Sequence, residues 1–232
     1  MDKESVLVFL LDVSPLEDET LFSEAYAKVD KKRQEKIDKF RFGADKRRSL
    51  GAGILLMEAA SFYGINPKET KIGQNEYGKP YFCDYKDVDF SLSHSGKYAV
   101  CAIGTGPLGC DIEKIKDANL NIAKRFFSEK EYEYLKDIED KEERNRSFFR
   151  LWTLKESYIK AIGEGLKHPL NDLVFKMPAE ENYYCEEAAF FFHNTVLEEG
   201  YSLSVAMGQK ARVRVINKDC SDMLLKNSIR IL

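Results

Sequence analysis

The sequence predicts an α+β fold built from two similar subdomains. Strand-like and helical segments alternate along the chain, as expected of a mixed class. Gly200–Gly208 also echoes Gly96–Gly104, because each begins and ends with glycine and holds an aromatic residue before an apolar strand of similar length. The echo predicts duplication of one α+β unit, although two generic strands can look alike. We place the boundary near Pro107, which gives subdomains of residues 1–107 and 108–232.

The first subdomain is expected to begin with a buried strand and to continue with helices. Val6–Leu11 is an apolar run too short to cross a membrane, and it lacks a small-residue cleavage site. Apolar residues recur at helical spacing through Glu17–Phe42, which predicts two helices. Ser49–Tyr63 is a more apolar helix that ends near Gly64. Neither a signal peptide nor a membrane span is expected here.

Turns and short strands are expected further along the chain. Asn75–Phe82 carries turn signals, and a loop is expected at His94–Gly96. Strands are predicted at Asp89–Ser93, Lys97–Gly104, Leu108–Ile112 and Tyr201–Met207, and a helix at Phe148–Ile162 with Gly163 closing it.

The composition is that of an ordinary globular protein. Of the 232 residues, 44% are hydrophobic and 32% charged, and 36 basic residues against 39 acidic ones give a net charge of −3. That balance argues against a general nucleic-acid binder, which would carry a basic excess. The five cysteines form no CxxC pair or metal-like spacing, so a reducing cytoplasm is the expected compartment.

Two carboxylates follow each other closely near the end of the strand predicted at Leu108–Ile112. Asp111 and Glu113 are two residues apart, so on a strand they point to the same face while Ile112 faces the core. Such close like charges need a positive partner. Mg²⁺ is suited, because it takes a few carboxylate oxygens, keeps waters and accepts phosphate oxygens. The alternative is a solvated strand end with two unrelated acids.

A second group of polar residues lies on one face of the helix predicted at Phe148–Ile162. Trp152, Glu156 and Lys160 are spaced at i, i+4 and i+8. Trp152 is the chain's only tryptophan, which indicates that the face is partly buried. A metal for Glu156 and a phosphate for Lys160 would satisfy both charges. The alternative is an exposed ion pair worth a few tenths of a kcal/mol.

Together these motifs resemble the signature of the Sfp-type 4′-phosphopantetheinyl transferases. The family pattern is Gly-x-Asp-x-Glu, then Trp-(Ser/Thr)-x-Lys-Glu-(Ser/Ala)-x-x-Lys-x-x-Gly. The fixed positions are met by Gly109, Asp111, Glu113, Trp152, Lys155, Glu156, Ser157, Lys160 and Gly163. Family-like segments also occur in the expected order at Gly78–Phe82, Phe90–Val100 and Ile122–Tyr132. The match runs from about Arg33 to Leu170.

The resemblance implies two α+β halves related by a pseudo-twofold axis, in a monomer that is a pseudo-dimer. Coenzyme A would bind in the cleft between the halves. Asp111, Glu113 and Glu156 would hold Mg²⁺ against the coenzyme A diphosphate. Lys160 would contact the same diphosphate, together with Ser93 and His94.

Six further residues are implied to bind the nucleotide end of coenzyme A. Arg48 would grip the 3′-phosphate with its planar donors. Arg33 and Lys36 match two basic residues near that phosphate, unless Lys31–Lys39 is only a solvated helix face. The six are Arg33, Lys36, Arg48, Ser49, Lys79 and Pro80, of which Ser49 would bind beside Arg48 and the last two would border the adenine.

The implied reaction moves the phosphopantetheine arm onto a serine of an apo acyl or peptidyl carrier protein and releases adenosine 3′,5′-bisphosphate. Asp111, Glu156 and Lys160 would carry catalysis, with Glu156 or a water on the metal taking the serine proton. The basic and aromatic Lys124–Phe127 suits an acidic carrier, although its phenylalanines can equally be core. One alternative is a coenzyme A- or carrier-binding protein that has lost catalysis. Another is a Mg²⁺-dependent nuclease, which the balanced charge does not favour.

Overall fold

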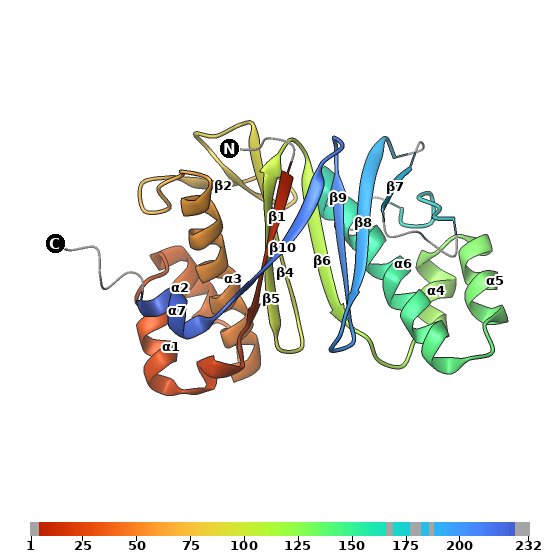
Figure 1. Cartoon of the computed structure of the whole chain (residues 1–232), viewed down its shortest axis with the longest axis horizontal. Coiled ribbons are helices and arrows are strands. Elements are labelled where there is room, and N and C mark those ends of the chain that lie inside the picture. Colours follow the sequence, from red (N-terminus) through yellow and green to blue (C-terminus); the bar gives the residue numbers. More distant parts are fainter. Residues whose placement is uncertain (1–4, 166–168, 177–181, 186–187, 226–232) are drawn as a thin grey trace.

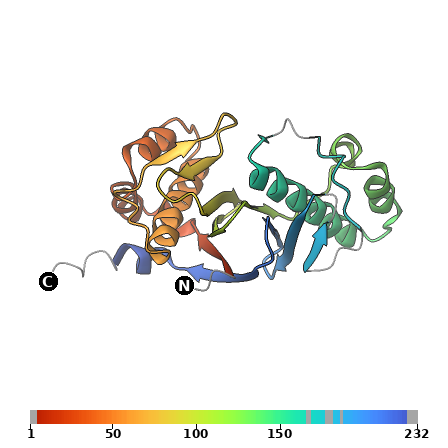
Figure 2. The same cartoon turned by 90° about the horizontal axis from the view of Figure 1, so that it is seen from above.

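The computed structural model describes residues 5–165, 169–176, 182–185 and 188–225. Its strands form two four-stranded sheets, ordered β10-β1-β5-β4 and β6-β9-β8-β7, and a two-stranded hairpin, β2-β3. Helices cover the sheets (Figures 1 and 2), which confirms the α+β class. Within the described ranges no helix is both long and apolar enough to cross a membrane.

The first half of the chain holds most of the first sheet and the hairpin. Its elements are β1 (Ser5–Asp12), the short 3₁₀ helix η1 (Ser14–Glu17), α1 (Glu19–Tyr26), α2 (Lys31–Asp38), α3 (Gly43–Phe62), β2 (Ile72–Gln74), β3 (Pro80–Phe82), β4 (Val88–Ser95) and β5 (Tyr98–Thr105). The rest are β6 (Leu108–Lys114), α4 (Leu120–Phe126), α5 (Glu129–Asp137), α6 (Lys141–Ile162), β7 (Asn182–Cys185), β8 (Phe190–Leu197), β9 (Tyr201–Met207), β10 (Arg212–Lys218) and α7 (Cys220–Leu225).

The two halves repeat one order of elements. A strand, two short helices, a long helix and an antiparallel strand pair occur as β1-α1-α2-α3-β4-β5 and again as β6-α4-α5-α6-β8-β9. In both sheets the last strand of the series, β5 or β9, lies in the middle and is antiparallel to both neighbours. This repetition agrees with the duplication suggested by the echo between the segments that form β5 and β9.

The end of the described chain returns to the first sheet. Strand β10 runs parallel to β1, with Ser5 opposite Arg212 and Leu11 opposite Lys218. Figure 1 shows β10 crossing to the side of the first-half helices, where α7 lies. The division at residue 107 therefore stays a prediction about the inherited units, because β10 joins the first sheet although it comes from the second half.

Side-chain alternation gives the first sheet two buried faces. In β1, Leu7, Phe9 and Leu11 pack in the core beneath α3. Val6, Val8 and Leu10 point the other way, into a second core. That second core joins the two halves, and it also holds Val100, Ala102, Leu108, Cys110, Ile112, Tyr201, Leu203, Val205 and Met207.

The same alternation turns the odd-numbered residues of β6 toward α6. Ile112 is fully buried in the joint core, as predicted, while Gly109, Asp111 and Glu113 occupy the opposite face. A Cβ added at Gly109 would overlap the carbonyl oxygen of Ser157 and the amide nitrogen of Ala161. Only glycine therefore lets α6 lie so close to β6.

Most predicted elements are confirmed, and several of them are longer than predicted. Helix α3 begins at Gly43, six residues before the predicted start, and α6 begins at Lys141, seven residues before. His94 and Ser95 belong to β4 rather than to a loop, because the antiparallel pairing with β5 continues to Ser95 and Tyr98. The end of α6 is as predicted, with Gly163 in the left-handed conformation at φ 72°.

Candidate active site

One large cavity lies where the two halves meet. Its volume is about 1080 Å³, and its walls come from α2, α3, the β2-β3 hairpin, β4, β6 and α6. It gathers nearly all of the site residues predicted from the sequence. Those that line it are Arg33, Lys36, Ser49, Lys79, Pro80, Ser93, His94, Asp111, Glu113, Glu156 and Lys160.

Asp111 is the most buried of the three predicted metal ligands. Its Oδ1 accepts hydrogen bonds from Ser93 Oγ at 2.7 Å and from Lys160 Nζ at 2.7 Å. Its Oδ2 is buried and has no hydrogen-bond partner in the described structure. A buried carboxylate oxygen without a partner is costly, so this atom is an open ligand position.

Glu113 and Glu156 approach Asp111 from a strand and from a helix. Burial raises the pKa of Glu156, and the Asp111 charge raises it further, against the opposing effect of Lys160. Burial likewise raises the pKa of Glu113, although the hydrogen bond from Ser95 opposes that shift. The cavity therefore concentrates negative charge that the protein alone does not neutralise.

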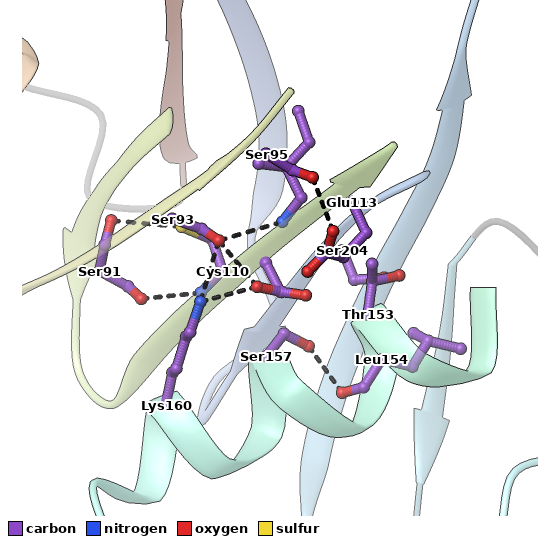
Figure 3. A network of polar contacts seen from close by, with 12 residues as sticks. Ser91, Ser93, Ser95, Cys110, Glu113, Thr153, Leu154, Ser157, Lys160 and Ser204 are labelled. Carbon is purple, nitrogen blue, oxygen red and sulfur yellow. Dashed lines mark hydrogen bonds and ion pairs between the residues drawn. The ribbon is translucent and has the colours of Figure 1, made fainter. Parts of the chain in front are cut away.

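Lys160 lies next to this acidic group at the end of α6. Burial on its own lowers the pKa of Lys160, but the attraction of Asp111, the hydrogen bond to it and the other surrounding acids together outweigh burial, and the pKa is raised overall. The side chain stays 30% exposed, and Nζ also donates to Ser93 Oγ at 3.0 Å. Figure 3 shows the amine reaching from α6 to Ser93 on β4. Lys160 is thus a charged donor in the cavity wall.

A cationic region lines the cavity on the side of α2. Arg33 and Lys36 are found there, as predicted, and burial lowers the pKa of both. Burial and surrounding cations also lower the pKa of His94. Ser49 Oγ also lines the cavity and is buried, with no hydrogen-bond partner among the described residues. This region is suited to an anionic ligand with several oxygens.

Two predicted contacts are engaged within the protein. Arg48 does not line the cavity; its guanidinium binds Asp45 at 2.5 Å and the Gly96 carbonyl at 3.1 Å. The Lys79 amine donates to Asp89 at 2.5 Å. It also donates to the Ala161 carbonyl at 3.0 Å and to the Leu108 carbonyl at 3.1 Å, so Lys79 joins the hairpin to α6 and β6. The roles of Arg48 and Lys79 toward coenzyme A stay predictions.

Lys155, the motif lysine next to Glu156, lies away from the cavity. It is fully buried and pairs with the buried Glu131 at 2.9 Å. Its Nζ also donates to the carbonyls of Leu170, at 2.8 Å, and Leu173. Glu131 in turn accepts the backbone N–H of Phe175 at 2.8 Å. This buried pair fixes α6 to α5 and to the segment after α6, so that Glu156 is held toward the cavity.

The residues present fit a hard divalent cation. Asp111, Glu113 and Glu156 offer the carboxylate oxygens that Mg²⁺ prefers, and the unpartnered Asp111 Oδ2 gives it a position. In the described ranges, however, no three acidic, histidine or cysteine side chains already form a ready-made metal cluster. The Lys160 amine, 2.7 Å from Asp111 Oδ1, supplies the positive charge at this point.

The comparisons with known proteins identify the family. A profile described as "4'-phosphopantetheinyl transferase superfamily" matches residues 107–206, and one described as "4'-phosphopantetheinyl transferase, N-terminal" matches residues 14–105. A Bacillus subtilis protein named 4′-phosphopantetheinyl transferase is 36% identical over 184 residues, which cover 77% of this chain and 82% of the relative. The chain belongs to the 4′-phosphopantetheinyl transferase family.

Two further matches to this phosphopantetheinyl transferase cover different shares of its chain. The psf-1 transferase of Bacillus pumilus is 29% identical over 226 residues, or 94% of this chain and 97% of the relative. A solved structure, the holo-[acyl-carrier-protein] synthase of Thermotoga maritima, is similar over 43% of this chain and 61% of that one, with 18% identity and a TM-score of 0.34. As a family member, the chain is an enzyme, a 4′-phosphopantetheinyl transferase.

Several residues in or next to the cavity of the transferase had no sequence signal strong enough to single them out. Lys28 and Lys32 line the cavity beside Arg33, but in the sequence they belong to a charged stretch that can equally face solvent. Asn75 donates to the Gly163 carbonyl at 2.8 Å, across 88 residues of sequence. Ser95 donates to Glu113 at 2.6 Å, and only the packing of β4 beside β6 reveals that contact.

Proposed function

We propose that this transferase moves the phosphopantetheine group of coenzyme A to a serine of an apo carrier protein, with Mg²⁺ as the metal. One observation carries the proposal. Two buried side-chain oxygens without partners, Asp111 Oδ2 and Ser49 Oγ, line one cavity in the described structure. Acids surround the first and cations lie near the second, so a ligand with a metal-bound diphosphate and a further phosphate satisfies both.

The reaction is an in-line displacement at the pantetheine-side phosphorus. The serine oxygen of the carrier forms a new P–O bond, and the bond to the bridging diphosphate oxygen breaks. That oxygen leaves with the electron pair as part of adenosine 3′,5′-bisphosphate. When bound, Mg²⁺ supplies positive charge against the diphosphate, and its ligands would be Asp111, Glu113 and Glu156.

Glu156 and Lys160 divide the remaining chemistry. Burial and the Asp111 charge raise the pKa of Glu156, which brings the carboxylate closer to the basicity required to accept the serine proton. Lys160 keeps its charge because its pKa is raised, and it binds the diphosphate oxygens as negative charge develops on the leaving group.

The carrier protein would dock beside α4 of the transferase. Arg125 is exposed and stacks on Phe126, 5.0 Å from its ring centre. Phe126 is half-buried and meets Trp152 edge-on at 6.2 Å, whereas Phe127 is buried. Because Trp152 also lines the cavity, this basic and aromatic patch borders the reaction site, where an acidic helical carrier would bind.

Intact-mass measurement of an apo peptidyl carrier protein tests the proposal. With the transferase, coenzyme A and Mg²⁺, the carrier is expected to gain one phosphopantetheine mass, and a carrier with its target serine changed to alanine should gain none. Asp111→Ala should bind adenosine 3′,5′-bisphosphate and remain folded but lose transfer. A chain that binds coenzyme A yet leaves every carrier unmodified would be a binding protein instead.

A further inference from the structure

Strands β4 and β6 run side by side, and side chains of β4 join them. Asp89 accepts the N–H of Leu108, and three serines of β4 continue the series along β6. In each of these hydrogen bonds, which we call rungs, a side-chain oxygen of β4 accepts the backbone N–H of the residue nineteen positions later in the chain. The serine rungs are Ser91 to Cys110 at 3.0 Å, Ser93 to Ile112 at 3.4 Å and Ser95 to Lys114 at 3.1 Å.

Two of these serines also hold the acids of the site. Ser93 Oγ donates to Asp111 Oδ1 at 2.7 Å. Ser95 Oγ donates to Glu113 Oε2 at 2.6 Å (Figure 3). A hydroxyl has one proton and two lone pairs, so Ser95 can accept from Lys114 and donate to Glu113 at once. The rung at Ser91 has no acid, because Gly109 occupies the corresponding position on β6.

We propose that Ser95 is a positioning residue for the metal site: its hydroxyl fixes the Glu113 carboxylate across the junction of the two halves. Ser95 is absent from the cavity wall, whereas Glu113 lines it, so Ser95 acts through Glu113. The short hydrogen bond binds one carboxylate oxygen and restricts the rotation of a flexible side chain. This inference rests on the proposed function only in taking Glu113 as a ligand.

Glu113 stands on β6 in the second half, while Ser95 comes from β4 in the first. The orientation of a ligand from one half is thus set by the other half. Hydrogen bonds to metal-binding carboxylates commonly affect metal affinity about 10- to 100-fold, so a measurable loss is expected without Ser95.

Binding of Mn²⁺, followed by electron paramagnetic resonance of the free ion, tests the role without any turnover. Ser95→Ala should weaken Mn²⁺ binding about 10-fold. Ser95→Thr keeps the hydroxyl on a strand and should restore the affinity to within about twofold of the unaltered protein. Equal affinity of Ser95→Ala and the unaltered chain would overturn the proposal.

Ser91→Ala is the matched control, because it removes a rung of the same series that touches no acid. It should leave Mn²⁺ affinity within about twofold, although it leaves a buried N–H without an acceptor and lowers the melting temperature measured in EDTA. An affinity loss equal to that of Ser95→Ala would mean that the junction as a whole matters, and would overturn the specific role.

Asp111→Ala separates this inference from the metal assignment. If Asp111→Ala weakens Mn²⁺ binding and Ser95→Ala does not, the metal site stands and the positioning role is wrong. If neither change weakens binding, the metal assignment itself is wrong, and the role of Ser95 fails with it. Transfer to a carrier is measured independently of all these titrations.

Discussion

The Glu156 carboxylate is half-buried on α6, in a cavity that also holds Asp111 and Glu113. Because burial and the Asp111 charge raise its pKa, the ionised form is less favourable in the folded chain than in the unfolded one. The folded state then binds this proton more tightly. Glu156 therefore lowers the stability of the metal-free protein at neutral pH, and the loss is recovered as pH falls through the raised pKa.

Glu156→Gln should separate stability from activity. Removing the charge is expected to raise the melting temperature in EDTA, by roughly 2–4 °C for each kcal/mol relieved in a chain of this size. Loss of a general base should reduce transfer about 10²- to 10⁴-fold. Scanning calorimetry and the carrier mass assay measure the two effects.

Glu142→Gln provides the control on the same helix. The Glu142 side chain is 82% exposed, so neither quantity should change measurably. An unchanged or lower melting temperature for Glu156→Gln would contradict the raised pKa. Transfer at the unaltered rate would show that another group accepts the serine proton.

His94 should take up a proton when a phosphate ligand binds. Burial and the nearby Arg48, Lys160 and Lys36 lower its pKa in the free protein, so near neutral pH it is uncharged. A bound phosphate brings negative charge and raises that pKa. The affinity that His94 contributes is therefore strongest at low pH and falls as pH rises through the pKa of His94 in the bound state.

Calorimetry with adenosine 3′,5′-bisphosphate, in two buffers of different ionisation enthalpy, measures this uptake directly. At about pH 6, the unaltered protein should take up as much as one proton more on binding this ligand than the His94→Gln variant does. The variant corrects for titration of the ligand's own phosphates. Equal proton uptake by both proteins would show that His94 does not face the ligand.

At the scale of elements, the contact of α6 with β6 positions the chemistry. Glu156 and Lys160 both belong to α6, and Asp111 belongs to β6. Because Gly109 lies against the backbone of α6, the helix carries its two functional groups close to the strand. The motif glycine and the motif acids therefore act together: the glycine allows the close approach of α6, and the acids are the proposed ligands.

Gly109→Ala is expected to push α6 away from β6. The added methyl meets backbone atoms that cannot rotate aside, so the free energy of unfolding should fall by about 1–3 kcal/mol or more. Transfer should fall well beyond what the loss of folded protein explains, because Glu156 and Lys160 move with the helix. Denaturant unfolding and the mass assay at full folding give the two values.

Gly43→Ala tests whether any glycine replacement has such effects. Gly43 lies in the first turn of α3, where the nearest atom to an added Cβ is the end of the Arg47 side chain at 3.4 Å. Alanine should be neutral or slightly stabilising there. Full transfer by Gly109→Ala would mean that the helix position does not limit the reaction.

The sequence patterns predicted the helices and strands better than they predicted the contacts between distant segments of the chain. The strand alternation placed Asp111 and Glu113 on one face, and helical spacing placed Glu156 and Lys160 on another, as the cavity confirms. No local pattern reports that Lys79 reaches Ala161 or that Ser95 holds Glu113, since those pairs are brought together by packing of distant segments. The ion pair of Arg48 with Asp45 could not be predicted for a related reason. The i, i+3 spacing allows the pair, but it does not show whether the Arg48 side chain turns to Asp45 or into the cavity.

At the scale of the whole molecule, the joint core makes the two halves unfold together. Residues of β1 and β5 interleave there with residues of β6 and β9, and β10 adds to the first sheet. Neither half can lose its structure without exposing apolar side chains of the other. A single cooperative transition is therefore expected.

The sole tryptophan allows that cooperativity to be measured. Trp152 reports on the second half, while Leu55 is fully buried in the core of the first half. Leu55→Ala should lower stability by about 2–5 kcal/mol and shift the denaturant midpoint of Trp152 fluorescence together with that of circular dichroism. A fluorescence midpoint that stays in place while circular dichroism becomes biphasic would show that the halves unfold separately.

The return of β10 to β1 also has a consequence during synthesis. Ser5 pairs opposite Arg212, so about 200 residues are made between the two strands. At 5–20 residues per second, that interval lasts roughly 10 to 40 s. Until β10 emerges, the edge of β1 that β10 will cover keeps unpaired N–H and carbonyl groups, which other nascent chains can pair with. A ribosome that stalls before β10 emerges would therefore release a chain prone to aggregation, even though every proposed catalytic residue has already been made.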